Sequence, residues 1–119
     1  MKTVLWISRH SMTPEQLADL ERSMGGPVRL RTWTDTVTDI AELAAAVREA
    51  DAVAAVLPLE LLSGLLRLAG CRPVLISASG RIPTGRAVEG ASGQPEQEFA
   101  FVHRCWRQLL RLEIETKTL

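Results

Sequence analysis

The sequence lacks the residue clusters on which metal-binding and disulfide-rich proteins depend. Its 119 residues include no tyrosine, two cysteines (Cys71 and Cys105) and two histidines (His10 and His103). Two cysteines without CxxC spacing do not form a metal site, and no group of histidines and carboxylates has the spacing of metal ligands. We therefore expect two reduced core thiols, no metal and no other cofactor.

An excess of positive charge is also missing. The 14 lysines and arginines balance 14 aspartates and glutamates, so the formal net charge is zero. Proteins that bind long DNA or RNA need a strongly basic surface to neutralise the phosphates. The charge balance therefore argues against a long nucleic acid as the partner and leaves a small nucleotide open.

Long apolar segments are absent as well. No apolar run reaches the roughly 18 residues of a transmembrane helix, and the N-terminal segment lacks the apolar region of a signal peptide. The sequence thus predicts no membrane contact and a cytoplasmic location. An apolar share of 46% and a charged share of 24% are ordinary for globular proteins, so we expect one domain over residues 1–119.

Three glycine-containing motifs that mark large enzyme classes do not occur. The P-loop pattern GxxxxGK[ST] and the dinucleotide pattern GxGxxG are missing, which argues against an ATPase and an NAD-dependent oxidoreductase. The nucleophile elbow GxSxG is missing too. Any catalysis must therefore use other residues.

Four short segments are typical of β-strands. Residues 3–7 and 52–57 are continuously apolar, as strands buried on both faces of a parallel sheet are. Residues 28–33 alternate apolar with polar side chains, which predicts a half-exposed strand at or near the sheet edge. Residues 73–76 form the fourth segment.

Helix signals separate these strands. Thr13 and Gln16 have the spacing of a capping box with proline at the first helical position, and the glycines at 25–26 end the predicted helix. Asp39 and Glu42 predict the cap of a second helix. The apolar residues 59–68 predict a third. This alternation indicates the α/β class: a Rossmann-like, mostly parallel twisted sheet with helices on both faces.

The C-terminal third is less regular. Residues 77–95 are rich in Ser, Gly, Pro, Arg and Glu without periodicity, which predicts a long loop or a loop with a short hairpin. Residues 96–110 have helical spacing of apolar side chains. Residues 112–118 alternate as a possible last strand.

Two polar segments follow strands of the predicted sheet, namely residues 8–11 and residues 77–81. In an open parallel sheet, ligands bind beyond the carboxyl ends of the strands, where the strand order reverses. We expect the two segments to meet there, beside the N-terminus of the first helix, whose N–H groups and dipole favour an anion. Together they predict a phosphate site.

His10 is the candidate for proton transfer, because histidine exchanges protons near neutral pH. A histidine that only shapes the turn is an equally good interpretation. Arg9, Arg81 and Arg86 are candidate phosphate ligands, although each also fits a solvated loop charge. The capping box is enough to explain why Thr13 and Gln16 occur at these positions, and contact with a ligand is a secondary role. Ser77 and Ser79 contact a ligand or only form the turn.

A family resemblance extends these expectations. An apolar strand followed by a polar residue and His10, then Met12-Thr13-x-x-Gln16 and a terminal Phe101-x-His103-x-x-Trp106-Arg107, resembles the small stand-alone CRISPR-associated proteins of type III loci. These proteins are relatives of the CARF domain that act as ring nucleases. The resemblance covers residues 4–20, 73–81 and 99–107.

The resemblance implies a homodimer that binds cyclic oligoadenylate, with cyclic tetra-adenylate the expected ring, and linearises it to switch off the antiviral signal. A ribose 2′-hydroxyl would attack the adjacent phosphodiester without a metal. His10 and Arg81 are the implied catalytic residues. The ligand-binding candidates are Ser8, Arg9, Ser11, Thr13, Gln16, Ser77, Ser79, Arg86, His103 and Arg107.

Two alternatives remain open at this point. The same site suits a nucleotide sensor that binds the ring without cleaving it. The neutral charge and the aromatic C-terminal segment also fit a protein-interaction domain whose loops are only connections. For His103, a packed histidine on an aromatic face is the simpler interpretation.

Overall fold

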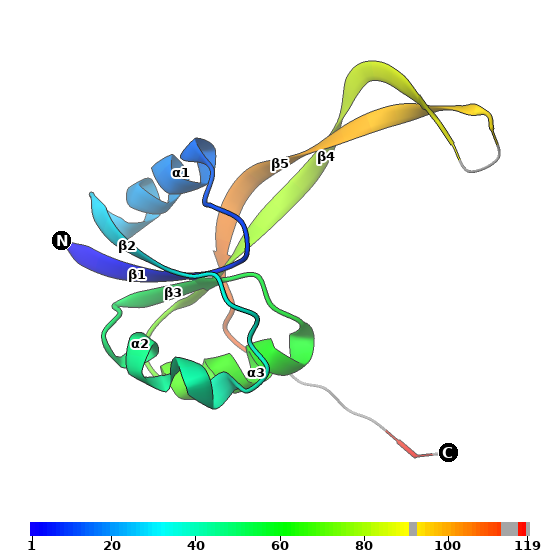
Figure 1. The fold of residues 1–119 in the computed structure, drawn as a ribbon. Helices are drawn as coiled ribbons and strands as arrows, with labels where there is room; N and C mark the ends of the chain where they lie inside the picture. The colour runs from blue at the N-terminus through cyan, green and yellow to red at the C-terminus, as the bar shows by residue number, and fades with distance from the viewer. Residues whose placement is uncertain (91–92, 113–116, 119) are drawn as a thin grey trace.

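The computed structural model describes residues 1–90, 93–112 and 117–118, and for residues 81–82, 88–89 and 99–101 it describes the backbone only. Its centre is a five-stranded sheet of order β2-β1-β3-β4-β5 (Figure 1). The strands are β1 (Lys2–Ile7), β2 (Val28–Trp33), β3 (Ala52–Ala55), β4 (Val74–Glu89) and β5 (Pro95–Gln108). The neighbours among β1 to β4 pair in parallel, and only β5 is antiparallel. The prediction of a mixed α/β chain with a mostly parallel sheet is therefore confirmed.

Helices cover both faces of this sheet. Helix α1 (Pro14–Met24) lies on one face, and the 3₁₀ helix η1 (Ile40–Leu43), α2 (Ala44–Arg48) and α3 (Leu59–Ala69) lie on the other (Figure 1). Side chains of β1 alternate between the two layers: Val4 and Trp6 pack with α1, whereas Leu5 and Ile7 pack against the other layer. All four are at most 3% exposed, which is why this strand reads as one continuous apolar run.

The helix signals in the sequence act as predicted. The Thr13 hydroxyl accepts a hydrogen bond from the Gln16 N–H, and the Gln16 side chain accepts one from the Thr13 N–H. Asp39 and Glu42 form a second complete capping box, but its first turn is the 3₁₀ helix η1. Gly25 ends α1 at a φ of 83°, a left-handed conformation that glycine adopts without steric cost.

The C-terminal third differs from the prediction. Strand β4 continues from the predicted residues 73–76 as far as Glu89, and residues 96–110 belong mainly to strand β5 rather than to a helix. The two strands form one long antiparallel hairpin with a register shift between Ala78 and Ser79. Because Ala78 pairs with Cys105 and Ser79 with His103, Arg104 is an extra residue on β5.

The bulge also changes which side chains of β5 share a face. In a regular strand, His103 and Trp106 would point to opposite faces, because they are three residues apart. The extra residue Arg104 restores a common face, and the His103 and Trp106 rings lie 5.2 Å apart between centroids. Spacing of three residues on one face is thus produced here by a bulged strand.

Three further expectations concern the ends and the cysteines. No strand is assigned to residues 111–112 or 117–118, and the rest of the predicted last strand lies outside the described residues. Both cysteines are free, but Cys71 is exposed and only Cys105 is partly buried, so the expectation of two core thiols is wrong for Cys71. Within the described part of the chain, no helix is long and apolar enough to cross a membrane.

Helix α3 offers a direct test of this core. Leu65 is fully buried in the cluster beneath α3, whereas Leu59 in the same helix is 58% exposed. We expect Leu65→Ala to lower the free energy of unfolding by about 2–5 kcal/mol, because it removes buried methyl groups and leaves a cavity. Urea denaturation measures the change, with Leu59→Ala as the matched control. Equal losses for both variants would contradict this packing.

Candidate functional site

Hydrogen bonds to its backbone hold the segment after β1 in one conformation. The Trp6 indole N–H donates to the His10 carbonyl oxygen at 2.9 Å, and the Ser8 hydroxyl accepts from the His10 N–H at 3.1 Å. The Ser8 N–H donates to the carbonyl oxygen of Trp33, at the end of β2. Ser8 is only 7% exposed, whereas Arg9 and His10 are exposed. The fold therefore fixes this tip and presents two cationic or titratable side chains to solvent.

A pocket of about 310 Å³ opens at this tip. It lies at the carboxyl ends of β1 and β3, on the face covered by α3, where the strand order changes direction. The polar lining residues are Ser8, Arg9, His10 and Asp35. The position is the one expected for a ligand site in an open parallel sheet.

The other residues that line this pocket are apolar. They are Ile7, Val37, Val56, Leu57, Pro58 and Leu61. Arg9 is oriented by a hydrogen bond from its Nη2 to the Thr36 hydroxyl at 2.6 Å. A guanidinium has five N–H donors, so this contact leaves donors for an anion. A pocket lined by a guanidinium and by apolar side chains suits a ligand that combines a phosphate with an aromatic ring.

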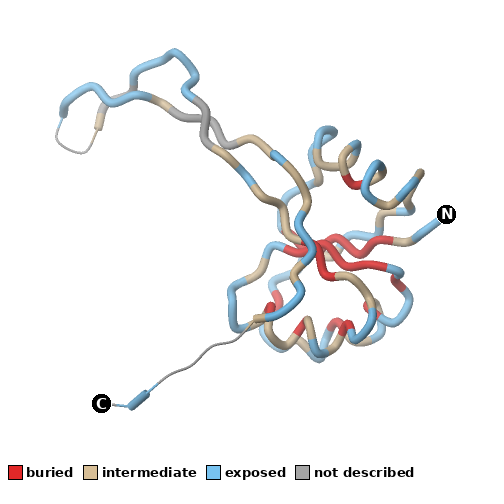
Figure 2. Tube along the Cα trace, turned by 180° about the vertical axis from the view of Figure 1, so that it is seen from behind, coloured by how far each residue is buried: buried red, intermediate tan, exposed pale blue. Residues whose placement is uncertain are grey.

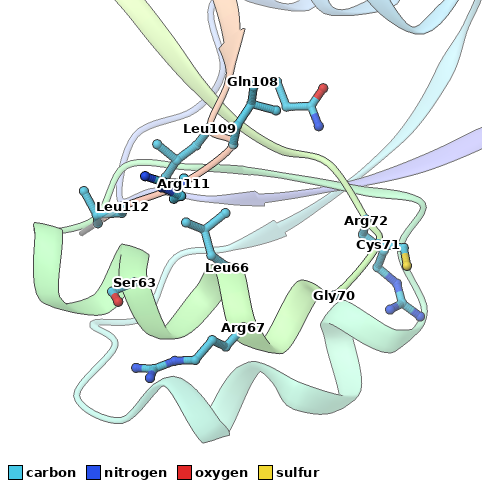
Figure 3. Close-up of a pocket in the computed structure, with 11 residues that line it drawn as sticks. Ser63, Leu66, Arg67, Gly70, Cys71, Arg72, Gln108, Leu109, Arg111 and Leu112 are labelled. Atoms are coloured by element: carbon cyan, nitrogen blue, oxygen red, sulfur yellow. The ribbon is translucent and has the colours of Figure 1, made fainter.

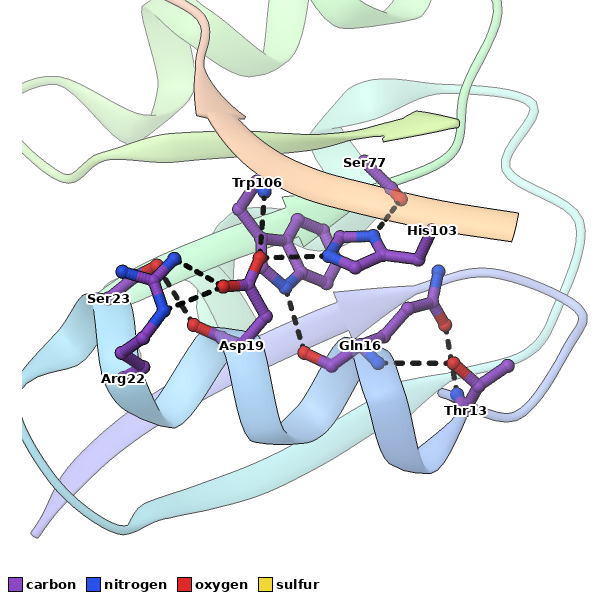
Figure 4. Close-up of polar contacts among 8 residues, drawn as sticks. All are labelled: Thr13, Gln16, Asp19, Arg22, Ser23, Ser77, His103 and Trp106. Carbon is purple, nitrogen blue, oxygen red and sulfur yellow. Dashed lines mark hydrogen bonds and ion pairs between the residues drawn. The ribbon is translucent and has the colours of Figure 1, made fainter. Parts of the chain in front are cut away.

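The second predicted polar segment does not form a loop beside this tip. Residues 77–81 lie inside β4, and none of them lines the pocket. Instead, the Ser77 hydroxyl and His103 Nδ1 are 2.6 Å apart, and His103 Nε2 is 2.9 Å from the Asp19 carboxylate (Figure 4). The expectation that the two segments meet in one site is therefore wrong. Ser77 is linked to helix α1 through His103 instead.

Asp19 is the centre of this network. Its carboxylate also accepts from the Trp106 backbone N–H at 3.2 Å and from Arg22 Nε at 3.0 Å (Figure 4). The Trp106 indole N–H donates to the Gln16 carbonyl oxygen at 2.8 Å, one turn earlier in α1. The hydrogen bond with His103, followed by that with Arg22, lowers the pKa of Asp19 below its ordinary value of 3.8.

Ser77, His103 and Asp19 contain the groups of a hydrolytic triad, but their placement is that of a structural contact. Ser77 lies within a paired strand, and the His103 side chain is 5% exposed. The Asp19 carboxylate only accepts, so His103 Nε2 is the donor to it, and both nitrogens of the ring are engaged within the network. The network thereby fastens both strands of the hairpin to α1, which agrees with the packed-histidine interpretation of His103.

The other candidates are spread over the molecule. Ser11 is exposed just before α1, and Thr13 and Gln16 are engaged in the capping box. Ser79, Arg86 and Arg107 are exposed on the hairpin, and none of them lines the pocket. The backbone of Arg81 pairs with Phe101, and its side chain lies outside the described residues.

A second pocket, of about 390 Å³, lies at the other end of the sheet (Figure 3). It is lined by Arg67, Arg72 and Arg111 among others, and by no predicted site residue. The Arg72 side chain donates hydrogen bonds to the backbone carbonyl oxygens of Ala50 and Arg48. Arg72 therefore has a structural role at this pocket. The pocket at the β1 tip is the one that combines the predicted residues.

The sequence did not predict the apolar lining of the pocket or the network centred on Asp19. The apolar lining comes from three segments far apart in sequence, and only the fold brings them together. Asp19 carried a weak signal, because it shares a helix face with Gln16 one turn before it. Among the described residues, no group of three or more histidines, cysteines and carboxylates is arranged to hold a metal ion.

No protein-family model, curated protein or solved structure matches this chain. Its function must therefore be inferred from the geometry of the pocket and from the sequence motifs.

The Asp19 network predicts a specific pH dependence of stability. A carboxyl whose pKa is lowered in the folded state stabilises the fold fully above its ordinary value near 3.8, and this contribution is lost as the pH falls through the lowered value. We expect Asp19→Asn to unfold more readily than wild type at pH 7, with a difference that shrinks below pH 3.8. Urea denaturation across this range measures it.

Asp35→Asn is the control, because Asp35 is an exposed carboxylate outside the network. It should keep the pH dependence of the wild type. Parallel loss of stability in wild type and Asp19→Asn on acidification would contradict the assignment of the lowered pKa to Asp19.

Proposed function

We propose that this chain is a Rossmann-like, CARF-related ring nuclease that binds cyclic oligoadenylate and linearises it without a metal ion. The observation that carries the proposal is the pocket at the β1 tip, which Ser8, Arg9 and His10 line together with apolar residues. These are residues of the first-strand motif on which the family resemblance rests. In this proposal the protein acts in the cytoplasm and ends type III CRISPR signalling.

The polar and the apolar lining residues of the pocket suit the phosphate and the nucleobase of a nucleotide, respectively. The donors of Arg9 suit a phosphate, and the apolar side chains of Leu57, Pro58 and Leu61 suit a nucleobase. A volume of about 310 Å³ is at the lower end for ligand pockets, so one chain holds one nucleotide unit rather than a whole ring. Two copies related by a two-fold axis would present two such pockets to cyclic tetra-adenylate, which has matching symmetry.

The reaction that fits these residues is internal transesterification. A ribose O2′ attacks the adjacent phosphorus, the P–O2′ bond forms and the P–O5′ bond breaks, which yields a 2′,3′-cyclic phosphate end and a 5′-hydroxyl end. The O2′ proton must leave and O5′ must gain one. His10 moves one of these protons, and water moves the other. The positive charge of Arg9 offsets the charge that builds on the phosphate oxygens.

Cleavage of labelled cyclic tetra-adenylate in EDTA tests this proposal. In single-turnover conditions we expect wild type to convert the ring to linear products, and His10→Ala to react roughly 10²-fold or more slowly, because a proton-transfer group is lost. Arg67→Ala is the control, since this exposed arginine lines the pocket at the other end of the sheet. An intact ring after long incubation with wild type overturns the nuclease proposal.

A thermal shift separates binding from cleavage. If the pocket binds the ring, ligand at about 100 times its dissociation constant should add about 2.7 kcal/mol to the free energy of unfolding. Arg9→Ala should remove most of this shift, whereas Arg67→Ala should keep it. A shift without cleavage selects the non-catalytic sensor, and no shift with any cyclic oligoadenylate selects the interaction domain.

A further inference from the structure

The pocket at the other end of the sheet concentrates positive charge. It lies between α3, with the turn that follows it, and residues 108–112 at the end of β5 (Figure 3). Arg67, Arg72 and Arg111 line it, and we call it the arginine pocket. No aspartate or glutamate is among its described lining residues, although the chain has as many acidic as basic side chains. The pocket is therefore a local cationic site on a protein without net charge.

Arg72 is a fixed cation in this pocket. Its guanidinium donates to the carbonyl oxygens of Ala50 at 2.9 Å, Arg48 at 3.1 Å and Ala69 at 3.4 Å. A guanidinium has five N–H groups, so two remain for a ligand. Because Ala69 is the last residue of α3, the third bond also offsets the negative end of the helix dipole. The carbonyl groups are neutral, so they orient the guanidinium and leave its positive charge to attract an anion.

Arg67 supplies a second cation beside polar side chains. It lies in the last turn of α3, is exposed, and makes no hydrogen bond or ion pair with other residues that the structure describes. Its donors are therefore open to a ligand. Ser63 lines the pocket one turn earlier in α3, and Gln108 lines it from β5. A hydroxyl and an amide can each donate and accept, so both suit the hydroxyl groups of a polar ligand.

The arginine pocket is open to solvent and has room for a small molecule. Each residue that lines it is partly or fully exposed, whereas buried residues are concentrated in the central strands and in the helices packed on them (Figure 2). Its volume of about 390 Å³ is in the range of small-molecule sites and exceeds the size of a bare anion. Leu66 and Leu109 also line it, which allows a carbon skeleton to pack there.

We propose that the arginine pocket binds the phosphate monoester of a small polar molecule, such as a sugar phosphate. Arg67 and Arg72 hold the phosphate by charge-assisted hydrogen bonds, and Ser63 and Gln108 bind hydroxyl groups of the remainder. Two guanidinium groups match the charge of a phosphate monoester, which approaches −2 at neutral pH, better than that of a single carboxylate.

This site goes beyond the proposed function and does not depend on it. The arginine pocket and the pocket at the β1 tip have no lining residue in common. The two sites can therefore be tested with separate variants and separate ligands.

Protection of Cys71 from alkylation tests the site. Cys71 is exposed and lines the arginine pocket, whereas Cys105 is partly buried in β5 and does not line it. Mass spectrometry follows the alkylation of each thiol by N-ethylmaleimide. Glucose 6-phosphate at about nine times its dissociation constant should slow the alkylation of Cys71 about tenfold, because about a tenth of the sites stay free. The alkylation of Cys105 should not change.

Arginine variants test which pocket holds the phosphate. In calorimetry, Arg67→Ala should weaken the binding of glucose 6-phosphate roughly tenfold or more, because a charge-assisted hydrogen bond is lost. Arg29→Ala is the matched control, since this exposed arginine of β2 lines neither pocket, and it should bind like wild type. Glucose and inorganic phosphate, the two parts of the probe, should each bind more weakly than the ester.

Four results would overturn the proposal. The first is no protection of Cys71 by millimolar glucose 6-phosphate or glycerol 3-phosphate, and the second is equal binding by Arg67→Ala and Arg29→Ala. The third is inorganic phosphate binding as tightly as the ester, which indicates a site for a bare anion. The fourth is loss of binding in Arg9→Ala alone, which places the ester at the β1 tip. Cleavage of cyclic oligoadenylate affects none of these results, so the two proposals fail separately.

Discussion

The carboxylate of Asp19 joins helix α1 to the two strands of the C-terminal hairpin. It contacts His103 and the Trp106 backbone on β5, and through His103 it reaches Ser77 on β4. A charged group at 16% side-chain exposure needs such partners, because the loss of water contacts is otherwise uncompensated. The same contacts hold both strands of the hairpin against α1.

The candidate site depends on a different kind of constraint. Trp6 is buried against α1 on one face of the sheet, and its indole N–H fixes the His10 carbonyl at the carboxyl edge. The pocket itself opens on the opposite face, beneath α3. One strand thus anchors its tip through one layer and presents Arg9 and His10 to a pocket formed by the other. The backbone of this tip is held in place, while the Arg9 and His10 side chains stay exposed, and such fixed positions favour precise contacts with a ligand.

Features that depend on residues close together in the sequence were predicted correctly, and features that depend on distant strand pairing were not. The capping boxes of Thr13 with Gln16 and of Asp39 with Glu42 involve residues three apart, and both were predicted correctly. Residues 96–108 were predicted as a helix, because their apolar side chains recur at intervals of three and four residues. They form a strand instead, because they pair with β4 earlier in the chain, and no local pattern encodes that pairing.

The sequence by itself determined the helix caps, the buried strands of the parallel sheet and the polar tip of Ser8, Arg9 and His10. These features follow from backbone hydrogen bonding and burial within short segments, whose physical requirements are written in neighbouring residues. Only the tertiary structure decided that Ser77 is linked through His103 to α1, and that Val56 and Leu57 line the same pocket as Arg9. Such contacts join segments distant in sequence, so strand order and register select them, and the residues alone do not.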